Sequence, residues 1–139
     1  MRPVPHLLIV DDEPNVLLTL GMIFEQDGYR VTRAASCAEA LHELANGNAL
    51  DAIITDLNME KPDIGLDVAR AALRLRPPPA VVVCTGYADI KNARAALQMR
   101  VVYFATKPVD LDELKIVVRR LSAQGASADE ENPGNRKVS

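Results

Sequence analysis

The sequence predicts an α/β fold in which five parallel strands form one sheet that is doubly wound, with helices on both faces, as (βα)5. Five short apolar runs alternate along the chain with segments whose apolar residues recur at helical spacing. Strict strand–helix alternation is typical of a parallel sheet with right-handed crossovers. Four of the runs are apolar almost throughout, which is typical of strands covered on both faces.

The second run alternates polar and apolar residues and is therefore placed nearer an edge of the sheet. The other four are expected to be buried strands. In chain order the five runs are Leu7–Val10, Tyr29–Thr32, Ala52–Ile54, Ala80–Cys84 and Val101–Phe104.

Each run is followed by a segment with helical periodicity. Pro14 suits the start of the first helix, because its missing N–H would be unpaired there. Ser36 and Glu39 form a capping box for the second helix, and Asp110 is the expected N-cap of the fifth. The segments lie near 14–27, 37–45, 66–75, 90–97 and 111–121.

Composition limits the class of protein. The 139 residues, 48% hydrophobic and 25% charged, suit one globular domain. The net charge of −3 and the pI of about 5.4 exclude a strongly basic surface for nucleic acid, and no apolar run is long enough to span a membrane. Cys37 and Cys84 are too few for a disulfide framework, so we expect a cytoplasmic protein.

We expect one domain over residues 1–122 and a disordered polar tail over 123–139. The residues after 122 are small, polar or charged and have no apolar periodicity.

Polar residues follow four of the expected strands. Asp11 and Asp12 follow the first, Asp56 the third, Thr85 the fourth and Lys107 the fifth. Because the carboxyl ends of parallel strands share one edge, we expect these side chains to converge. Carboxylates so close repel one another, and Mg²⁺, which prefers oxygen ligands, relieves that repulsion.

A magnesium site beside a hydroxyl and an ammonium group suits phosphoryl transfer. The cation and Lys107 stabilise charge on the phosphoryl oxygens, and a carboxylate can be the nucleophile. Asp56 is the expected nucleophile because it is the lone acid after a buried apolar strand.

Four stretches at these strand ends match a known pattern in order and spacing. They are Leu8–Pro14, Ile53–Met59, Val83–Asp89 and Phe104–Pro108. Together they make the chain, over about residues 6–122, resemble a response-regulator receiver domain of two-component signalling. The resemblance implies a flavodoxin-like sheet with strand order 2-1-3-4-5.

The resemblance also implies how the site works. Asp56 accepts a phosphoryl group from a phosphohistidine on a sensor histidine kinase or phosphotransfer protein. Asp12, Asp56 and the backbone carbonyl of Asn58 bind Mg²⁺, and Asp11 assists, partly through water. Thr85 hydrogen-bonds the phosphoryl group.

Lys107 pairs with a phosphoryl oxygen, and its bond to Pro108 is expected to be cis. Thr85 and Phe104 are the implied switch residues, with Tyr103 as a neighbour that complicates the assignment. Their movement changes the face made by the fourth helix, fifth strand and fifth helix, which binds a downstream protein or a second copy of the chain. Neither nucleic acid nor a membrane is an expected partner.

The chain departs from the family pattern in the loop after Asp56. Members often continue Met-Pro-Gly, whereas residues 59–65 here read Met-Glu-Lys-Pro-Asp-Ile-Gly, with one extra residue before the last Gly. Kinase docking and the dephosphorylation rate are the properties in which this altered loop is expected to differ from the family pattern. Arg100 and Val101 also replace a small Gly-Ala pair before Phe104.

Other interpretations stay open. An Asp-nucleophile phosphatase uses similar residues, but it usually carries a second Asp where this chain has Asn58. A third possibility is a binding module with this fold that is not phosphorylated. Taken singly, Asp11–Glu13 is also explained by helix capping, Asp56–Asn58 by an Asx turn, and Thr85 or Lys107 by a strand end or turn. The chain is either a stand-alone regulator or a piece of a longer protein.

Overall fold

The computed structural model describes residues 4–86 and 102–130. All five strands are parallel and form one sheet in the order β2-β1-β3-β4-β5, which confirms the predicted fold and strand order. The strands are β1 (His6–Val10), β2 (Arg30–Ala34), β3 (Ala52–Asp56), β4 (Ala80–Thr85) and β5 (Val102–Thr106).

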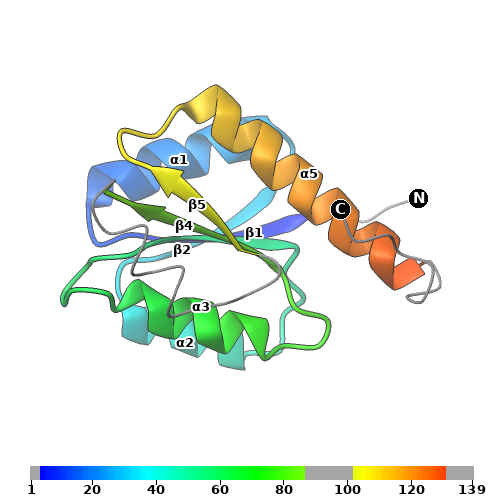
Figure 1. Ribbon diagram of the computed structural model, residues 1–139, viewed down its shortest axis with the longest axis horizontal. Coiled ribbons are helices and arrows are strands. Elements are labelled where there is room, and N and C mark those ends of the chain that lie inside the picture. The colour runs from blue at the N-terminus through cyan, green and yellow to red at the C-terminus, as the bar shows by residue number, and fades with distance from the viewer. Residues whose placement is uncertain (1–3, 87–101, 131–139) are drawn as a thin grey trace.

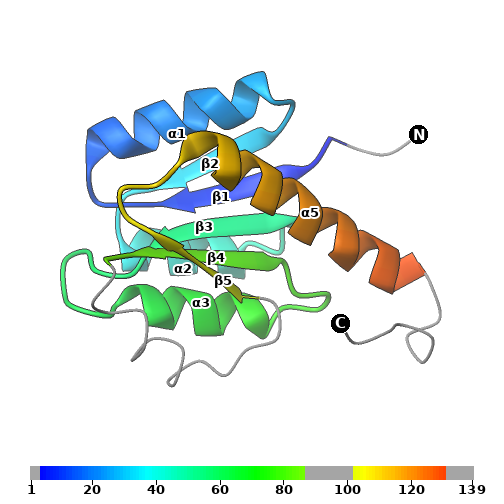
Figure 2. The ribbon, with the colours of Figure 1, turned by 45° about the horizontal axis from the view of Figure 1, so that its top comes forward.

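Helices cover both faces of this sheet, giving three layers (Figure 1). On one face lie α1 (Pro14–Gln26) and α5 (Leu111–Glu130), and on the other lie α2 (Cys37–Ala45) and α3 (Gly65–Leu73). Figure 2, turned from that view, shows the strands side by side, with α5 crossing in front of the sheet. The helix predicted near residues 90–97 lies outside the described residues.

The capping residues act as predicted. Ser36 accepts a hydrogen bond from the Glu39 N–H at 3.1 Å, and Asp110 accepts one from the Glu113 N–H at 3.1 Å. The Glu39 carboxylate bonds the N–H of Ala35, one residue before the expected partner. These bonds satisfy backbone donors that the first turn of a helix leaves unpaired.

Helix α5 is longer than predicted. It continues to Glu130, so residues 123–130, which we assigned to a disordered tail, are helical. The lack of apolar periodicity marks only the end of core contact, whereas the Ala, Gln, Asp and Glu residues of this segment allow a helix to continue. Residues 131–139 lie outside the described part of the chain.

Alternate residues along a strand point to opposite faces of the sheet, so the strands contribute side chains to two separate cores. One core faces α2 and α3, and its strand residues include Leu8, Val10, Ile53, Val81 and Val83. The other faces α1 and α5, and its strand residues include Leu7, Ile9, Ile54, Val82 and Cys84. β1, β3 and β4 are thus buried on both faces, and the buried polar residues Thr55, Asp56 and Thr85 lie at the carboxyl ends of β3 and β4.

Within the described ranges, no helix combines the length and the apolar character that crossing a membrane requires.

Gly65 permits a close approach between the start of α3 and the end of β3. Its N–H donates to the Leu57 carbonyl at 2.8 Å. A Cβ at this position would lie 2.8 Å from the Leu57 Cα and would collide with the carbonyl oxygen of Asp56. Any larger residue must therefore displace the backbone that carries Asp56.

We expect Gly65→Ala to lower the free energy of unfolding by about 1–3 kcal/mol, the usual cost of overpacking against backbone. Urea denaturation measures the change. Gly21→Ala is the matched control, because the added Cβ there meets only the flexible end of Arg33 and alanine favours the helix. An equal loss in both variants would contradict this account.

Candidate functional site

Three carboxylates meet at the carboxyl edge of the sheet. Asp11 and Asp12 follow β1, and Asp56 ends β3, the neighbour of β1 in the sheet. One oxygen from each carboxylate lies within 4.8 Å of the other two. Asp11 and Asp56 are buried and Asp12 is exposed, so the cluster opens to solvent on one side.

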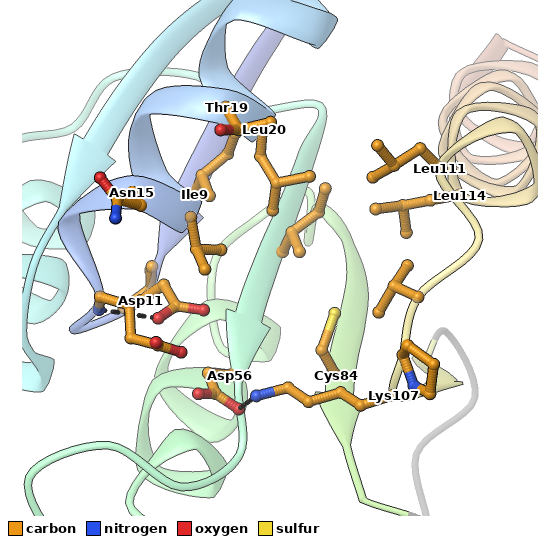
Figure 3. Close-up of a pocket in the computed structure, with 16 residues that line it drawn as sticks. Ile9, Asp11, Asn15, Thr19, Leu20, Asp56, Cys84, Lys107, Leu111 and Leu114 are labelled. Carbon is orange, nitrogen blue, oxygen red and sulfur yellow. Dashed lines mark hydrogen bonds and ion pairs between the residues drawn. The ribbon is translucent and has the colours of Figure 1, made fainter.

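Lys107 reaches this cluster from the segment between β5 and α5. Its Nζ lies 2.9 Å from Oδ1 of Asp56 (Figure 3). The Lys107 N–H donates to the Thr85 carbonyl at 2.9 Å, which ties its backbone to the end of β4. The bond between Lys107 and Pro108 is cis, as the resemblance implied.

The electrostatics reflect this crowding. Burial raises the pKa of Asp11 and the Asp56 charge raises it further, against the opposing effects of the Glu13 N–H and Lys107. Burial acts to lower the pKa of Lys107, but its hydrogen bond and charge interaction with Asp56 leave that pKa raised. The ammonium is therefore held charged beside carboxylates that repel one another.

The donor set fits Mg²⁺. Within the described ranges the cluster consists of carboxylates alone, and hard divalent cations prefer oxygen ligands. A bound cation would offset both the burial of the Asp11 charge and its repulsion by Asp56, the two largest causes that raise the Asp11 pKa. Asp11, Asp12 and Asp56 are thus brought together as predicted.

Asn58 lies two residues after Asp56 at the start of the loop of residues 57–64. Its side-chain oxygen accepts the Asp63 N–H at 2.7 Å. The side chain is therefore used within the loop, while its predicted role at the metal concerns the backbone carbonyl.

Thr85 and Phe104 lie on the same face of neighbouring strands. Phe104 pairs with Val83, two residues before Thr85, and packs against the core that faces α2 and α3. The buried Thr85 hydroxyl donates to the Gly86 carbonyl at 3.2 Å. Tyr103 lies on the opposite face, with its hydroxyl 3.4 Å from Glu113 of α5, so it is Phe104 that shares a face with Thr85.

A cavity of about 400 Å³ adjoins the cluster between α1 and the start of α5 (Figure 3). Asp11, Asp56 and Lys107 line one end, and the rest of the lining is mostly apolar. Cys84 also lines it, and burial raises the pKa of its thiol to about 12. Its thiol is thus protonated at neutral pH, and Cys84 behaves as a small buried hydrophobe.

Two residues beside the site escaped the sequence interpretation. Gly65 was seen only as a landmark in the loop, although a glycine opening a helix near the acidic strand end was a usable signal. Glu60 was named only as part of the altered loop, but its carboxylate accepts the Cys37 N–H at 3.1 Å, a contact between residues 23 positions apart. No local pattern indicates that pairing.

Comparison with known proteins shows the family to which this chain belongs. Residues 7–119 match the response regulator receiver domain family. The chain is 38% identical over 126 residues to the transcriptional regulatory protein GlrR of Escherichia coli, covering 91% of this chain and 28% of that protein. It is 35% identical over 116 residues to the E. coli TorCAD operon transcriptional regulatory protein TorR, covering 84% of this chain and 49% of that protein.

Solved structures agree with the sequence matches. A response regulator receiver protein from Sinorhizobium medicae superposes with a TM-score of 0.79 at 28% identity, covering 88% of this chain and 97% of that one. A receiver domain protein from Clostridium thermocellum gives a TM-score of 0.77 at 31% identity, covering 86% and 95%. The chain spans about a quarter to a half of the length of the curated relatives named above.

We expect Asp11→Asn to stabilise the metal-free protein, because it removes a buried charge from a repelling cluster. In EDTA at pH 7 the Tm should rise by about 3 °C, as for about 1 kcal/mol in a domain of this size. A carboxyl group whose pKa is raised by folding destabilises the folded state at pH values above its ordinary pKa of 3.8. The stability gained by Asp11→Asn should therefore shrink as the pH falls toward 3.8.

Scanning calorimetry of the wild type, Asp11→Asn and Asp112→Asn tests this. Asp112 is an exposed carboxylate on α5, outside the cluster, and serves as the control. Adding Mg²⁺ should stabilise the wild type more than Asp11→Asn. A lower Tm for Asp11→Asn in EDTA would refute the repulsion argument.

Proposed function

Because the chain belongs to the response regulator receiver domain family, we propose that it is a phosphorylation-dependent switch whose acceptor is Asp56. One observation carries the proposal. The buried Asp56 carboxylate lies among three clustered acids with the Lys107 ammonium 2.9 Å from its oxygen. That arrangement joins a nucleophile, a cation site and a fixed positive charge.

The residues that would hold Mg²⁺ are Asp12, Asp56 and the backbone carbonyl of Asn58, with Asp11 assisting through water. When bound, the ion supplies positive charge that offsets the cluster and the incoming phosphoryl oxygens. The supporting observation is the convergence of the three carboxylates; Asn58 follows Asp56 by two residues in the chain.

The chain's own residues carry the transfer. An Asp56 oxygen forms the new bond to phosphorus while the phosphorus–nitrogen bond of the donor histidine breaks and its electron pair returns to the imidazole. Lys107, already paired with Asp56, stabilises charge on the phosphoryl oxygens. Thr85 donates its hydroxyl to one of them after leaving the Gly86 carbonyl.

We propose that Thr85 and Phe104 transmit the effect of phosphorylation to a binding surface. Because they share one face of β4 and β5, rotation of Thr85 toward the phosphoryl group changes the space open to the Phe104 ring. The phosphoryl group then favours one of two arrangements by its different contacts in each. The surface that changes includes β5 and α5, where we propose that a downstream protein or a second copy binds.

We propose a phosphoacceptor that assists its own phosphorylation and dephosphorylation, not an enzyme acting on external phosphate esters. A phosphatase of the Asp-nucleophile class usually carries an Asp, as general acid, at the position of Asn58. The amide there cannot donate an acidic proton, and its oxygen is bonded to the Asp63 N–H.

The proposed phosphoryl donor is a sensor histidine kinase or a phosphotransfer protein, the partners of this family. We propose a cytoplasmic location, which is supported by free, buried cysteines at Cys37 and Cys84.

We expect Asp56→Asn to abolish Mg²⁺-dependent labelling by a small acyl phosphate donor, because an amide oxygen is a poor nucleophile. Intact-mass spectrometry before and after donor addition measures the labelling. Asp63→Asn is the matched control, since Asp63 is exposed in the adjoining loop at a φ of 63° that asparagine also tolerates. Undiminished labelling of Asp56→Asn would remove Asp56 as the acceptor.

A further inference from the structure

We propose that Glu60 is a positioning residue for the metal site: its hydrogen bond to the start of α2 fixes the loop of residues 57–64 beside Asp56. The inference rests on the proposed function and deepens it. It concerns how tightly the unphosphorylated protein binds Mg²⁺.

The two ends of the loop are clamped to the sheet. The Leu57 N–H donates to the Cys84 carbonyl at 2.9 Å, and the Gly65 N–H donates back to the Leu57 carbonyl at 2.8 Å. Both ends of the loop are therefore bonded at the fully buried Leu57, next to the end of β3. Between these ends, the position of the loop depends on its own contacts.

Most polar contacts of the loop are internal. Asn58 accepts the Asp63 N–H at 2.7 Å, and the Lys61 carbonyl accepts the N–H groups of Met59 and Ile64 at 3.3 and 3.4 Å. These bonds give the loop a defined shape. Besides these bonds, Met59 and Ile64 pack against the core that faces α2 and α3, so the loop rests on the domain through apolar contacts at these two residues.

Glu60 supplies a polar link from the loop to another element. Its Oε2 accepts the Cys37 N–H at 3.1 Å. Cys37 is the first residue of α2, and the first four N–H groups of a helix have no partner within it. The Ser36 hydroxyl accepts the Glu39 N–H, so Glu60 satisfies a different donor of the same turn.

The surroundings of Cys37 agree with this placement. Burial raises the pKa of the Cys37 thiol, and the charges of Asp67 and Glu60 raise it further. A carboxylate at a helix N-terminus also interacts favourably with the helix dipole. The contact is therefore stabilised by charge as well as by hydrogen bonding.

The link matters because Glu60 is only two residues from Asn58. If Glu60 releases α2, the loop that carries the Asn58 backbone loses a polar tie to the rest of the domain, and its position relative to Asp56 is less firmly fixed. Removing groups that orient metal ligands commonly weakens metal affinity by about 10- to 100-fold. We expect the lower end of that range, because the ends of the loop stay clamped.

Three single variants separate hydrogen bonding from charge. Glu60→Ala removes the acceptor and should weaken Mg²⁺ binding about tenfold in titration calorimetry. Glu60→Gln keeps an acceptor of the same length without the charge and should weaken Mg²⁺ binding much less than Glu60→Ala does. Lys61→Ala changes the charge of the same exposed loop and should match the wild type.

A second readout does not involve the metal. In Mg²⁺-free protein, the Cys37 amide should exchange its hydrogen faster in Glu60→Ala than in the wild type and Glu60→Gln, as followed by NMR. For labelling of Asp56, Glu60→Ala should raise the Mg²⁺ concentration giving half-maximal rate and leave the rate at saturating Mg²⁺ unchanged.

A substitution at Cys37, the donor of the hydrogen bond, tests the same contact in case Glu60→Ala fails to fold. Cys37→Pro removes the N–H at the first helical position, where proline is tolerated, and Cys37→Ala is its packing control. Cys37→Pro should weaken Mg²⁺ binding as Glu60→Ala does, and the double variant should be no weaker.

Two results would overturn the inference. Equal weakening in Glu60→Gln and Glu60→Ala would show that the charge acts at a distance, and wild-type Mg²⁺ affinity in Glu60→Ala would show that the bond positions nothing. The Mg²⁺ and exchange measurements use unphosphorylated protein, so they are distinct from failure of Asp56 labelling, which would overturn the proposed function.

Discussion

Repulsion among three carboxylates at one edge of the sheet is the constraint on which the rest of the site depends. Parallel pairing of β1 with β3 forces Asp11, Asp12 and Asp56 together, and burial of two of them denies the charges full solvation. Lys107 offsets part of that charge from the segment after β5. The negative charge that remains suits a divalent cation, and it is the basis of the phosphoryl transfer that we propose.

The remainder of the fold holds this unfavourable arrangement in place. Two apolar cores, one on each face of the sheet, stabilise strands whose ends carry the charges. Gly65 lets α3 start directly against the Asp56 backbone, which leaves little room for the end of β3 to shift toward α3. The loop between them is tied to α2 by Glu60. Core packing thus offsets the unfavourable free energy of placing these charges close together.

The alternation of strands and helices, the edge position of β2 and the cluster itself could be predicted because they follow from local pattern and from the geometry of parallel sheets. Helix caps at Ser36 and Asp110 have short-range signals and were also predicted. The Glu60–Cys37 contact joins distant segments through a loop of unusual shape, which local patterns do not encode. The extension of α5 was missed because apolar periodicity reports core contact and does not mark where a helix ends.

A crystal structure with Mn²⁺ and beryllium fluoride tests the central claim most directly. Anomalous scattering locates the metal, and beryllium fluoride mimics the phosphoryl group. The account predicts one metal peak in contact with Asp12 and Asp56, with the fluoride group on an Asp56 oxygen and Lys107 turned toward it. A metal bound elsewhere, or beryllium fluoride on another carboxylate, would contradict it.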